Sequence, residues 1–581
     1  MLTKLNGANC IKRYCGLLCL VLMFLWSMPI GAFAANTTVD LESQPYDSET
    51  LLVKLAVPQI GTMSTMGATT ESIVDYGDLE FLLDVKAAPT NGARRARAQQ
   101  ASWYVLHLNE GETVEAVKEK LEQDSSVLAV TFNYNLTVLD GESDSDYEKS
   151  DETKQRIINN SENNETNDNI DEITTNDQSD SLVTQSTANQ WHLSAAGLPA
   201  AKSYLASNGF NSGGSSDVIV AVLDTGVDYN HPDLKDSILR DADGNVIGGD
   251  TRKSKDENYD YSGDYSGDPK PDTAREDYMH GTHCAGIIAA TGAVAAEGVA
   301  KDVKILPVKM LDSSGGGMAD MIKGIIFAKQ QGAKVVSMSI GLAVAGMYAA
   351  EADEVYAPIL DTIRKYDDEM IFVAAGNASK TMENDSYGWP NEPVAGVSNY
   401  CLTYPAVYPE VIGVMSYDQN PTTDGDQKSN FSRWDPTPGN EREFEIAAPG
   451  SNIFSTVPGN AYASWSGTSM ATPYVAGCAA LLLTKYQNRD DFTIQDVKDI
   501  LLQNTDSMQA ITIGGTIYKM PALRIDKALE FKRTAVVSAP YYQYYLTNGS
   551  GRAPHIAAES SGGTKFKYSY RNDSYSGSSA P

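Results

Sequence analysis

Two kinds of apolar pattern alternate along the second half of the chain. Short runs rich in β-branched residues have the length of buried strands, and longer stretches between them carry apolar residues at helical spacing. The predicted strands are 218–223, 303–309, 334–339, 370–375, 411–415 and 444–447, and the predicted helices are 281–291, 318–331, 356–366, 469–487 and 493–502. This alternation predicts an α/β domain of three layers, with a mostly parallel central sheet covered by helices on both faces.

A smaller folded region is predicted at 49–139. Strand-like runs occur at 51–55, 79–85, 103–108 and 127–138, and apolar residues recur at helical spacing from Val114 to Leu121. The order of these runs predicts a small α+β domain that precedes the larger one.

Composition separates the two folded regions. Between residues 140 and 180 there are 14 acidic and 3 basic residues, with almost nothing apolar. Such a segment cannot bury enough surface to fold, so 140–189 is predicted to be an acidic disordered linker that proteases can reach. The larger domain is then assigned to 190–531. Residues 532–581 are rich in Tyr, Gly and Ser and form either a tail or part of an extra domain.

The first 34 residues have the pattern of a secretory signal peptide. Basic residues precede the apolar run 16–26, and the small-x-small sequence Ala32-Phe33-Ala34 follows it. The alternative, a retained membrane anchor, is disfavoured because the run is shorter than the roughly 20 residues that span a bilayer. No later stretch is apolar enough to span. The chain is therefore predicted to be secreted or held at the cell surface, with no membrane span after signal removal.

Charge and cysteine content narrow the function further. A net charge of −31 argues against nucleic acid as a partner. Three of the six cysteines lie in the predicted signal peptide, which leaves Cys284, Cys401 and Cys478. This odd set is no disulfide framework, and the sequence leaves open whether any two of them form a bridge.

The first motif with chemical meaning surrounds Ser469, in Gly467-Thr468-Ser469-Met470-Ala471-Thr472-Pro473. A serine where a loop becomes a helix lies near unpaired backbone N–H groups and the positive end of the helix dipole. That position suits a nucleophile, and it equally suits an ordinary helix cap.

A carboxylate and a histidine accompany this serine. Strand 218–223 runs into Asp224-Thr225-Gly226, and the carboxyl ends of parallel strands are where reactive side chains gather. An aspartic protease would need a second such motif, which the sequence lacks. His280 opens the next predicted helix and can act as the general base that a serine hydroxyl requires. The second histidine of the motif, His283, lacks the accompanying glutamate of a zinc-protease signature and is predicted to be structural.

A fourth motif follows strand 370–375. Asn377, in Ala375-Gly376-Asn377, is either a turn residue or an amide that donates to a developing oxyanion.

Taken together and in this order, the four motifs resemble those of the subtilisin-like serine peptidases, the subtilase family. The resemblance implies hydrolysis of peptide bonds through an acyl-enzyme, with Asp224 orienting His280 and His280 activating Ser469. It also implies that Asn377 and the backbone N–H of Ser469 bind the oxyanion, and that no cofactor is needed for the chemistry.

The same resemblance implies a substrate groove and a zymogen. Two extended segments, Ser339-Ile340-Gly341 and Ala374-Ala375-Gly376, are expected to flank a peptide that adds as a β-strand. The region 49–139 is similar to the family's propeptide, an intramolecular inhibitor and chaperone. Self-processing is then expected in or near the acidic linker, and the partners are protein or peptide substrates and the chain's own propeptide.

A structural calcium ion is a separate expectation. Asp233 matches a calcium ligand of the family, but the loop 291–297 lacks the asparagines that usually complete the site. Asp241, Asp243 and Asn245 form a second oxygen-rich loop that could bind the ion. Two alternatives to a broad secreted protease stay open: a processing protease with one cognate substrate, and a catalytically silent surface-binding homologue.

Overall fold

The computed structural model describes residues 46–56, 73–86, 100–138, 190–252, 267–272, 279–312, 316–345, 349–376, 401–435, 444–489, 492–531, 555–559 and 565–569. All of these residues belong to one compact unit, Pro45–Pro581. The predicted signal peptide, the predicted linker, Asn377 and most of the tail lie outside the described residues.

The smaller domain is an antiparallel sheet with one helix packed on it. Its strand order is β2-β3-β1-β4, and α3 contacts β1 and β4. The bounds are β1 Tyr46–Ala56, β2 Gly77–Lys86, β3 Gln100–Leu108, α3 Val114–Leu121 and β4 Val127–Tyr134. Val114, Val117 and Leu121 are the residues that α3 buries, so the helical spacing read from the sequence marks its core face.

The predicted strand 127–138 is two strands in two different sheets. After β4 ends at Tyr134, β5 (Thr137–Val138) pairs with β10 (Ile340–Ala345) of the larger domain. The resulting three-stranded sheet has the order β12-β10-β5, where β12 spans Cys401–Tyr404. The end of the smaller domain is thereby joined to the larger one through backbone hydrogen bonds.

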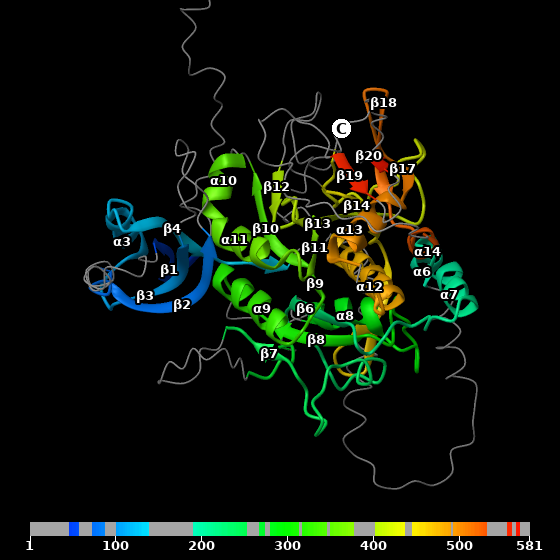
Figure 1. The fold of residues 1–581 in the computed structure, drawn as a ribbon, viewed down its shortest axis with the longest axis horizontal. Helices are drawn as coiled ribbons and strands as arrows, with labels where there is room; N and C mark the ends of the chain where they lie inside the picture. The colour runs from blue at the N-terminus through cyan, green and yellow to red at the C-terminus, as the bar shows by residue number, and fades with distance from the viewer. Residues whose placement is uncertain are drawn as a thin grey trace, which may run out of the picture. The chain divides into compact units, whose positions relative to one another are not determined.

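The larger domain is built on a nine-stranded sheet of order β17-β18-β14-β13-β11-β9-β6-β8-β7 (Figure 1). The strands of this sheet pair in parallel, except for the antiparallel edge pair β17 and β18. The bounds are β6 Ile219–Asp224, β7 Gly249–Asp250, β8 Lys304–Lys309, β9 Val335–Met338, β11 Ile371–Ala375, β13 Val411–Tyr417, β14 Ile446–Pro449, β17 Asp506–Ile513 and β18 Thr516–Ala522.

Helices cover both faces of this sheet. Val220 and Val222 of β6 belong to the core that includes α8 and α12, whereas Leu223 faces α9 and lies beside Gly324. Both faces of the strand are therefore buried, as expected for a parallel sheet. The helices are α6 Trp191–Ala195, α7 Leu198–Ser207, α8 His280–Ala289, α9 Met318–Gln330, α10 Ala349–Val355, α11 Ala357–Tyr366, α12 Thr468–Tyr486, α13 Ile494–Gln503 and α14 Ile525–Glu530.

Two hairpins complete the described part of the larger domain, and a third lies near the end of the chain. β15 (Ile453–Val457) pairs with β16 (Ala461–Trp465), β17 pairs with β18, and β19 (His555–Glu559) pairs with β20 (Lys565–Ser569). Among the described residues, no helix combines the length and apolar character needed to cross a membrane.

Candidate active site

Asp224 is the last residue of β6, at the carboxyl end of the sheet. Its side chain is fully buried, and one carboxylate oxygen accepts a hydrogen bond from the Thr225 backbone N–H at 2.7 Å. The apolar run before it forms the strand, and Gly226 (φ +100°) turns the chain away from the sheet immediately afterwards. The carboxylate is therefore held in place by the strand end itself.

His280 is the first residue of α8, and its Nδ1 lies 2.8 Å and 3.0 Å from the two Asp224 oxygens. The close approach depends on Gly281, because a Cβ there would lie 2.4 Å from the Gly226 carbonyl oxygen. The Gly281 N–H also donates to the Thr225 hydroxyl at 3.0 Å. Both residues of the Asp224–His280 pair are completely buried in this structure.

Ser469 is the second residue of α12, and the N-cap of that helix is Gly467. Its hydroxyl donates to the Ser339 carbonyl oxygen at 3.0 Å, while the Ser339 hydroxyl donates to the Ser469 carbonyl oxygen at 2.9 Å. The helix-cap interpretation of Ser469 is therefore wrong, since another residue occupies the cap and the hydroxyl bonds to a neighbouring segment.

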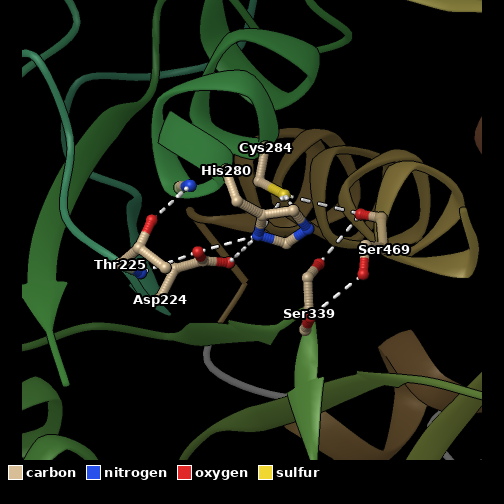
Figure 2. A network of polar contacts seen from close by, with 7 residues as sticks. Asp224, Thr225, His280, Cys284, Ser339 and Ser469 are labelled. Carbon is tan, nitrogen blue, oxygen red and sulfur yellow. Dashed lines mark hydrogen bonds and ion pairs between the residues drawn. The ribbon is translucent and has the colours of Figure 1, made fainter. Parts of the chain in front are cut away.

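Figure 2 shows the His280 imidazole between the Asp224 carboxylate and Ser469. Cys284, one helical turn after His280, lies beside the His280 ring (Figure 2). Its sulfur is 3.8 Å and 3.9 Å from the two His280 ring nitrogens and 3.5 Å from the Ser469 carbonyl oxygen. Three motifs far apart in the sequence thus meet at one place.

Asp224, His280 and Cys284 are close enough for their ligand atoms to surround one metal ion. Burial raises the pKa of the Cys284 thiol, and the hydrogen bond between His280 Nδ1 and Asp224 already joins the other two side chains. The second histidine, His283, is also fully buried, and burial lowers its pKa to about 3. It stacks on Trp465 and contacts the Ala463 carbonyl oxygen, so its role is structural.

The first predicted groove segment lies along a strand edge that β5 occupies in the structure. Ile340 and Gly341 pair antiparallel with Val138 and Thr137 of β5. Ser339, one residue earlier, makes the two hydrogen bonds to Ser469 described above. This edge therefore accepts an extended chain immediately beside Ser469.

The second predicted segment is not an edge. Ala374 is paired with Met338 on one side and with Gly413 on the other, because β11 is an interior strand. Ala375 pairs with Val414. The Gly376 N–H donates to the Val414 oxygen at 3.1 Å, and the Gly376 oxygen accepts from the Arg433 N–H at 2.9 Å. The expectation that Ala374, Ala375 and Gly376 pair with an added strand is wrong, since the sheet already uses these backbone groups.

The second segment that pairs with residues 135–138 is instead a run of glycines that includes Gly316 and Gly317. The sequence interpretation overlooked this run. The Leu136 N–H donates to the Gly316 oxygen at 2.8 Å, and Asn135 forms an antiparallel bridge with Gly317. Residues 135–138 thus lie between two segments of the larger domain. The run of glycines before predicted helix 318–331 was the available signal, since glycine lets another backbone approach closely.

Asp233 is fully buried, and both of its carboxylate oxygens are occupied by donors. One oxygen accepts the Val294 N–H at 2.7 Å. The other accepts the N–H groups of Ala295 and Ala296 at 2.9 and 3.0 Å and the Tyr462 hydroxyl at 2.8 Å. Burial alone would raise the pKa of Asp233, but these hydrogen bonds outweigh it and lower the pKa below its usual value.

These donors do not fit a calcium ion. Calcium is bound by oxygen atoms that point their lone pairs at it, whereas the loop around Asp233 points N–H and O–H hydrogens at the carboxylate. In the second loop expected to bind calcium, the Asp241 carboxylate is likewise used by hydrogen bonds from within the loop. The Asp241 carboxylate accepts the backbone N–H groups of Asp243 and Asn245 and the Asn245 side-chain amide.

The α/β fold and the meeting of an aspartate, a histidine and a serine are the arrangement expected of hydrolases with a serine nucleophile. Comparison with known proteins specifies the family. The sequence profile of the subtilase family matches residues 215–530, more than half of the chain. This chain belongs to the subtilase family, and its fold is the subtilisin-like α/β fold.

Individual relatives agree with this assignment. Thermitase from Thermoactinomyces vulgaris is 37% identical over 269 residues, which are 46% of this chain and 75% of thermitase. The intracellular serine protease of Paenibacillus polymyxa is 36% identical over 336 residues, covering 55% of this chain and 84% of that protein. Subtilisin DY from Bacillus licheniformis is 33% identical over 277 residues, or 47% and 78% of the two chains. The protein is a serine-type endopeptidase, and no cofactor is required for the chemistry of this family.

Proposed function

We propose that this chain is a secreted endopeptidase made as a self-processing zymogen, with Asp224, His280 and Ser469 as its catalytic triad. His280 removes the proton from the Ser469 hydroxyl as this attacks a peptide carbonyl, and later gives the proton to the leaving amine. Asp224 holds the imidazole in one orientation and balances the charge that forms on it. The distances of 2.8 and 3.0 Å between Asp224 and Nδ1 support this role.

The oxyanion of the tetrahedral intermediate needs hydrogen-bond donors already in place. The backbone N–H of Ser469, in the first turn of α12, is one proposed donor, and the positive end of the helix dipole adds to it. The Asn377 side-chain amide is the other. Asn377 lies outside the described residues, but Gly376, its neighbour in sequence, is held by two backbone hydrogen bonds at the end of β11.

The pairing of β5 with β10 carries the zymogen proposal. Thr137 and Val138 occupy the strand edge of Ile340 and Gly341. A substrate cannot pair with this edge while β5 is there, so the smaller domain 49–139 acts as an inhibitor of its own chain.

Two further groups of contacts hold the smaller domain on the peptidase domain. Asp361 of α11 accepts hydrogen bonds from the Lys54 ammonium at 2.7 Å and from the Trp103 indole N–H at 2.9 Å. On α9, Lys323 lies 2.8 Å from the Glu80 carboxylate. Glu80 and Lys323 are both buried, so this ion pair is shielded from solvent and adds specificity to the docking.

At the start of α9, the smaller domain supplies the acceptor for the backbone N–H of Ala319. The Asn133 side-chain oxygen accepts the Ala319 N–H at 3.0 Å, although the N-cap residue itself is Gly317. Since glycine has no side chain to satisfy the N–H groups of the first turn, Asn133 takes over that function. This contact supports the view that the two domains fold together.

Once β5 leaves, Ser339, Ile340 and Gly341 become free to pair with a substrate peptide. Ala374, Ala375 and Gly376 then contribute a fixed wall at the end of β11. Secretion is supported by the signal-peptide pattern and the strongly acidic composition of the chain. Calcium is not part of the proposal at Asp233, because hydrogen-bond donors fill the coordination space.

The test compares the full-length wild type with Ser469→Ala and with Ser464→Ala, a control at an exposed serine of the neighbouring hairpin. We expect the wild type and Ser464→Ala to split into two fragments, to hydrolyse a casein substrate and to react with a fluorophosphonate. Ser469→Ala should remain intact and unlabelled. Processing or labelling of purified Ser469→Ala would refute the assigned nucleophile, and an inert wild type would favour the silent surface-binding alternative.

A further inference from the structure

The segment 135–138 approaches Ser469 in a fixed register. Asn135 bridges to Gly317, the Leu136 N–H donates to the Gly316 oxygen, and Thr137 and Val138 pair with Gly341 and Ile340. Leu136 is only 5% exposed, so its side chain anchors the segment as well as its backbone. Contacts on both sides leave little freedom for the segment to slip along the groove.

The antiparallel pairing sets which residue comes next to the nucleophile. Each step forward along β5 corresponds to one step backward along β10, from Gly341 to Ile340 and then to Ser339. Ser339 is the residue whose carbonyl oxygen accepts the Ser469 hydroxyl at 3.0 Å. A strand continued by one residue beyond Val138 would therefore place the carbonyl of residue 139 beside Ser469.

We infer that the first maturation cleavage breaks the peptide bond between Leu139 and Asp140. The inference rests on the proposed self-processing and adds the bond at which it occurs. Leu139 and Asp140 lie outside the described residues, so the assignment comes from the register of residues 135–138 against Ser339. This bond falls where the folded α+β domain meets the acidic segment in the sequence.

The reaction at this bond is ordinary acyl transfer. The Ser469 oxygen bonds to the Leu139 carbonyl carbon, and the bond from that carbon to the Asp140 nitrogen breaks. The hydroxyl proton passes through His280 to the Asp140 nitrogen, which leaves as a new amino terminus. Water then adds its hydroxyl to the acyl carbon and returns a proton to Ser469, which frees a Leu139 carboxylate.

Cleavage at this bond has a further consequence for latency. The new Leu139 carboxylate remains covalently attached to β5, whose pairing with β10 does not involve the broken bond. The processed fragment therefore stays in the groove until the rest of the smaller domain leaves. Processing and release of activity are expected to be separate steps in time.

The experiment uses the purified full-length chain, sampled at the earliest detectable processing, with both fragments measured by intact mass and amino-terminal sequencing. We expect one fragment ending at Leu139 and another beginning at Asp140. If the first two fragments had other ends and formed only in chains that contain Ser469, the assigned bond would be wrong and the proposed function would still stand. Processing that persists in purified Ser469→Ala would instead overturn the proposed self-processing.

A substitution pair gives an independent check. Asp140→Pro replaces the leaving amine by a ring nitrogen that lacks an N–H, and we expect the fragment ending at Leu139 to disappear. Asn160→Pro, farther along the acidic segment, should leave the fragment unchanged. Formation of the same fragment at the wild-type rate in Asp140→Pro would contradict the inference. In a Ser469→Ala background, an unchanged Tm on adding Asp140→Pro would show that the substitution leaves the chain folded.

Discussion

Asp224 and Asp233 are two buried carboxylates, nine positions apart, with opposite surroundings. Both are fully buried, and both accept backbone N–H groups. Asp224 also faces the imidazole of His280, whereas Asp233 faces a loop and the Tyr462 hydroxyl. Burial therefore does not distinguish the proposed catalytic carboxylate, Asp224, from the proposed structural one, Asp233. The two carboxylates differ instead in the chemical nature of their hydrogen-bond donors, because an imidazole can exchange a proton with a substrate and a backbone N–H cannot.

The largest contrast between the two carboxylates is expected in catalysis. With each variant processed in trans by added wild type, Asp224→Asn should lower kcat/KM by about 10⁴-fold, because the imidazole loses its orientation and charge balance. Asp233→Asn should keep a rate close to that of the wild type. The measurement is hydrolysis of a chromogenic peptide at a temperature where both variants are folded. A comparable loss in Asp233→Asn would show that the two carboxylates are not separate in function.

The second contrast concerns stability. In a Ser469→Ala background, which prevents self-digestion, Asp233→Asn should lower the free energy of unfolding by about 2 to 3 kcal/mol, since the charge that accepts these hydrogen bonds is lost. For a folded region of this size the loss corresponds to a fall in Tm of roughly 2 to 4 °C. Asp243→Asn, at an exposed position of the neighbouring loop, is the matched control and should leave Tm unchanged. Equal Tm values for the two variants would argue against a structural role for Asp233.

The sequence was sufficient to predict the strand before Asp224 and the helices that begin at His280 and near Ser469. Each of these is a local pattern: an apolar run that ends at a polar residue, or a helix with a clear start. The helix predicted at 493–502 also has a local start signal, because Thr493 and Asp496 form a capping box. The three residues come together because the carboxyl ends of parallel strands and the starts of the following helices share one edge of the sheet.

The contacts that the sequence interpretation missed join segments far apart in the chain. Nothing near Asp233 indicates that Tyr462, more than 200 residues later, donates to it. The division of 127–138 into two strands likewise depends on β10, which no local pattern reveals. By contrast, the hairpin of β17 and β18 had a usable signal in Gly514-Gly515. Both glycines have positive φ, at +57° and +84°, as a tight two-residue hairpin turn requires.

Acid should reduce the stability difference between the wild type and Asp233→Asn. The pKa of Asp233 is lowered in the folded protein. Its stabilising contribution is therefore complete above the unfolded-state pKa of about 4, and is lost as the pH falls through the lower, folded-state pKa. In the Ser469→Ala background, urea unfolding at several pH values should show the two stabilities converging below about pH 4. A constant difference down to the lowest pH would mean that the charge of Asp233 is not what stabilises the loop.

A smaller effect is expected from the tyrosine that completes the Asp233 site. Tyr462→Phe removes one donor and keeps the ring that stacks on Phe454, so the predicted loss is about 1 kcal/mol, or roughly 1 °C in Tm. Combined with Asp233→Asn, the tyrosine substitution should cost less than it does alone, because its acceptor has already changed. Strict additivity in the double variant would indicate that the hydroxyl acts independently of Asp233.

The smallest expected effect is that of calcium on the difference in Tm between Asp233→Asn and its Ser469→Ala parent. The Tm difference between the Asp233→Asn variant and its parent should be equal in excess calcium and in chelator. A cation at Asp233 would stabilise only the parent, by an amount that grows with calcium concentration, whereas N–H donors stabilise it at every concentration. Because only the difference is compared, calcium bound elsewhere in the chain shifts both proteins together and does not affect the conclusion. A difference that vanished in chelator would show that a cation, rather than the N–H groups of residues 294–296, holds this carboxylate.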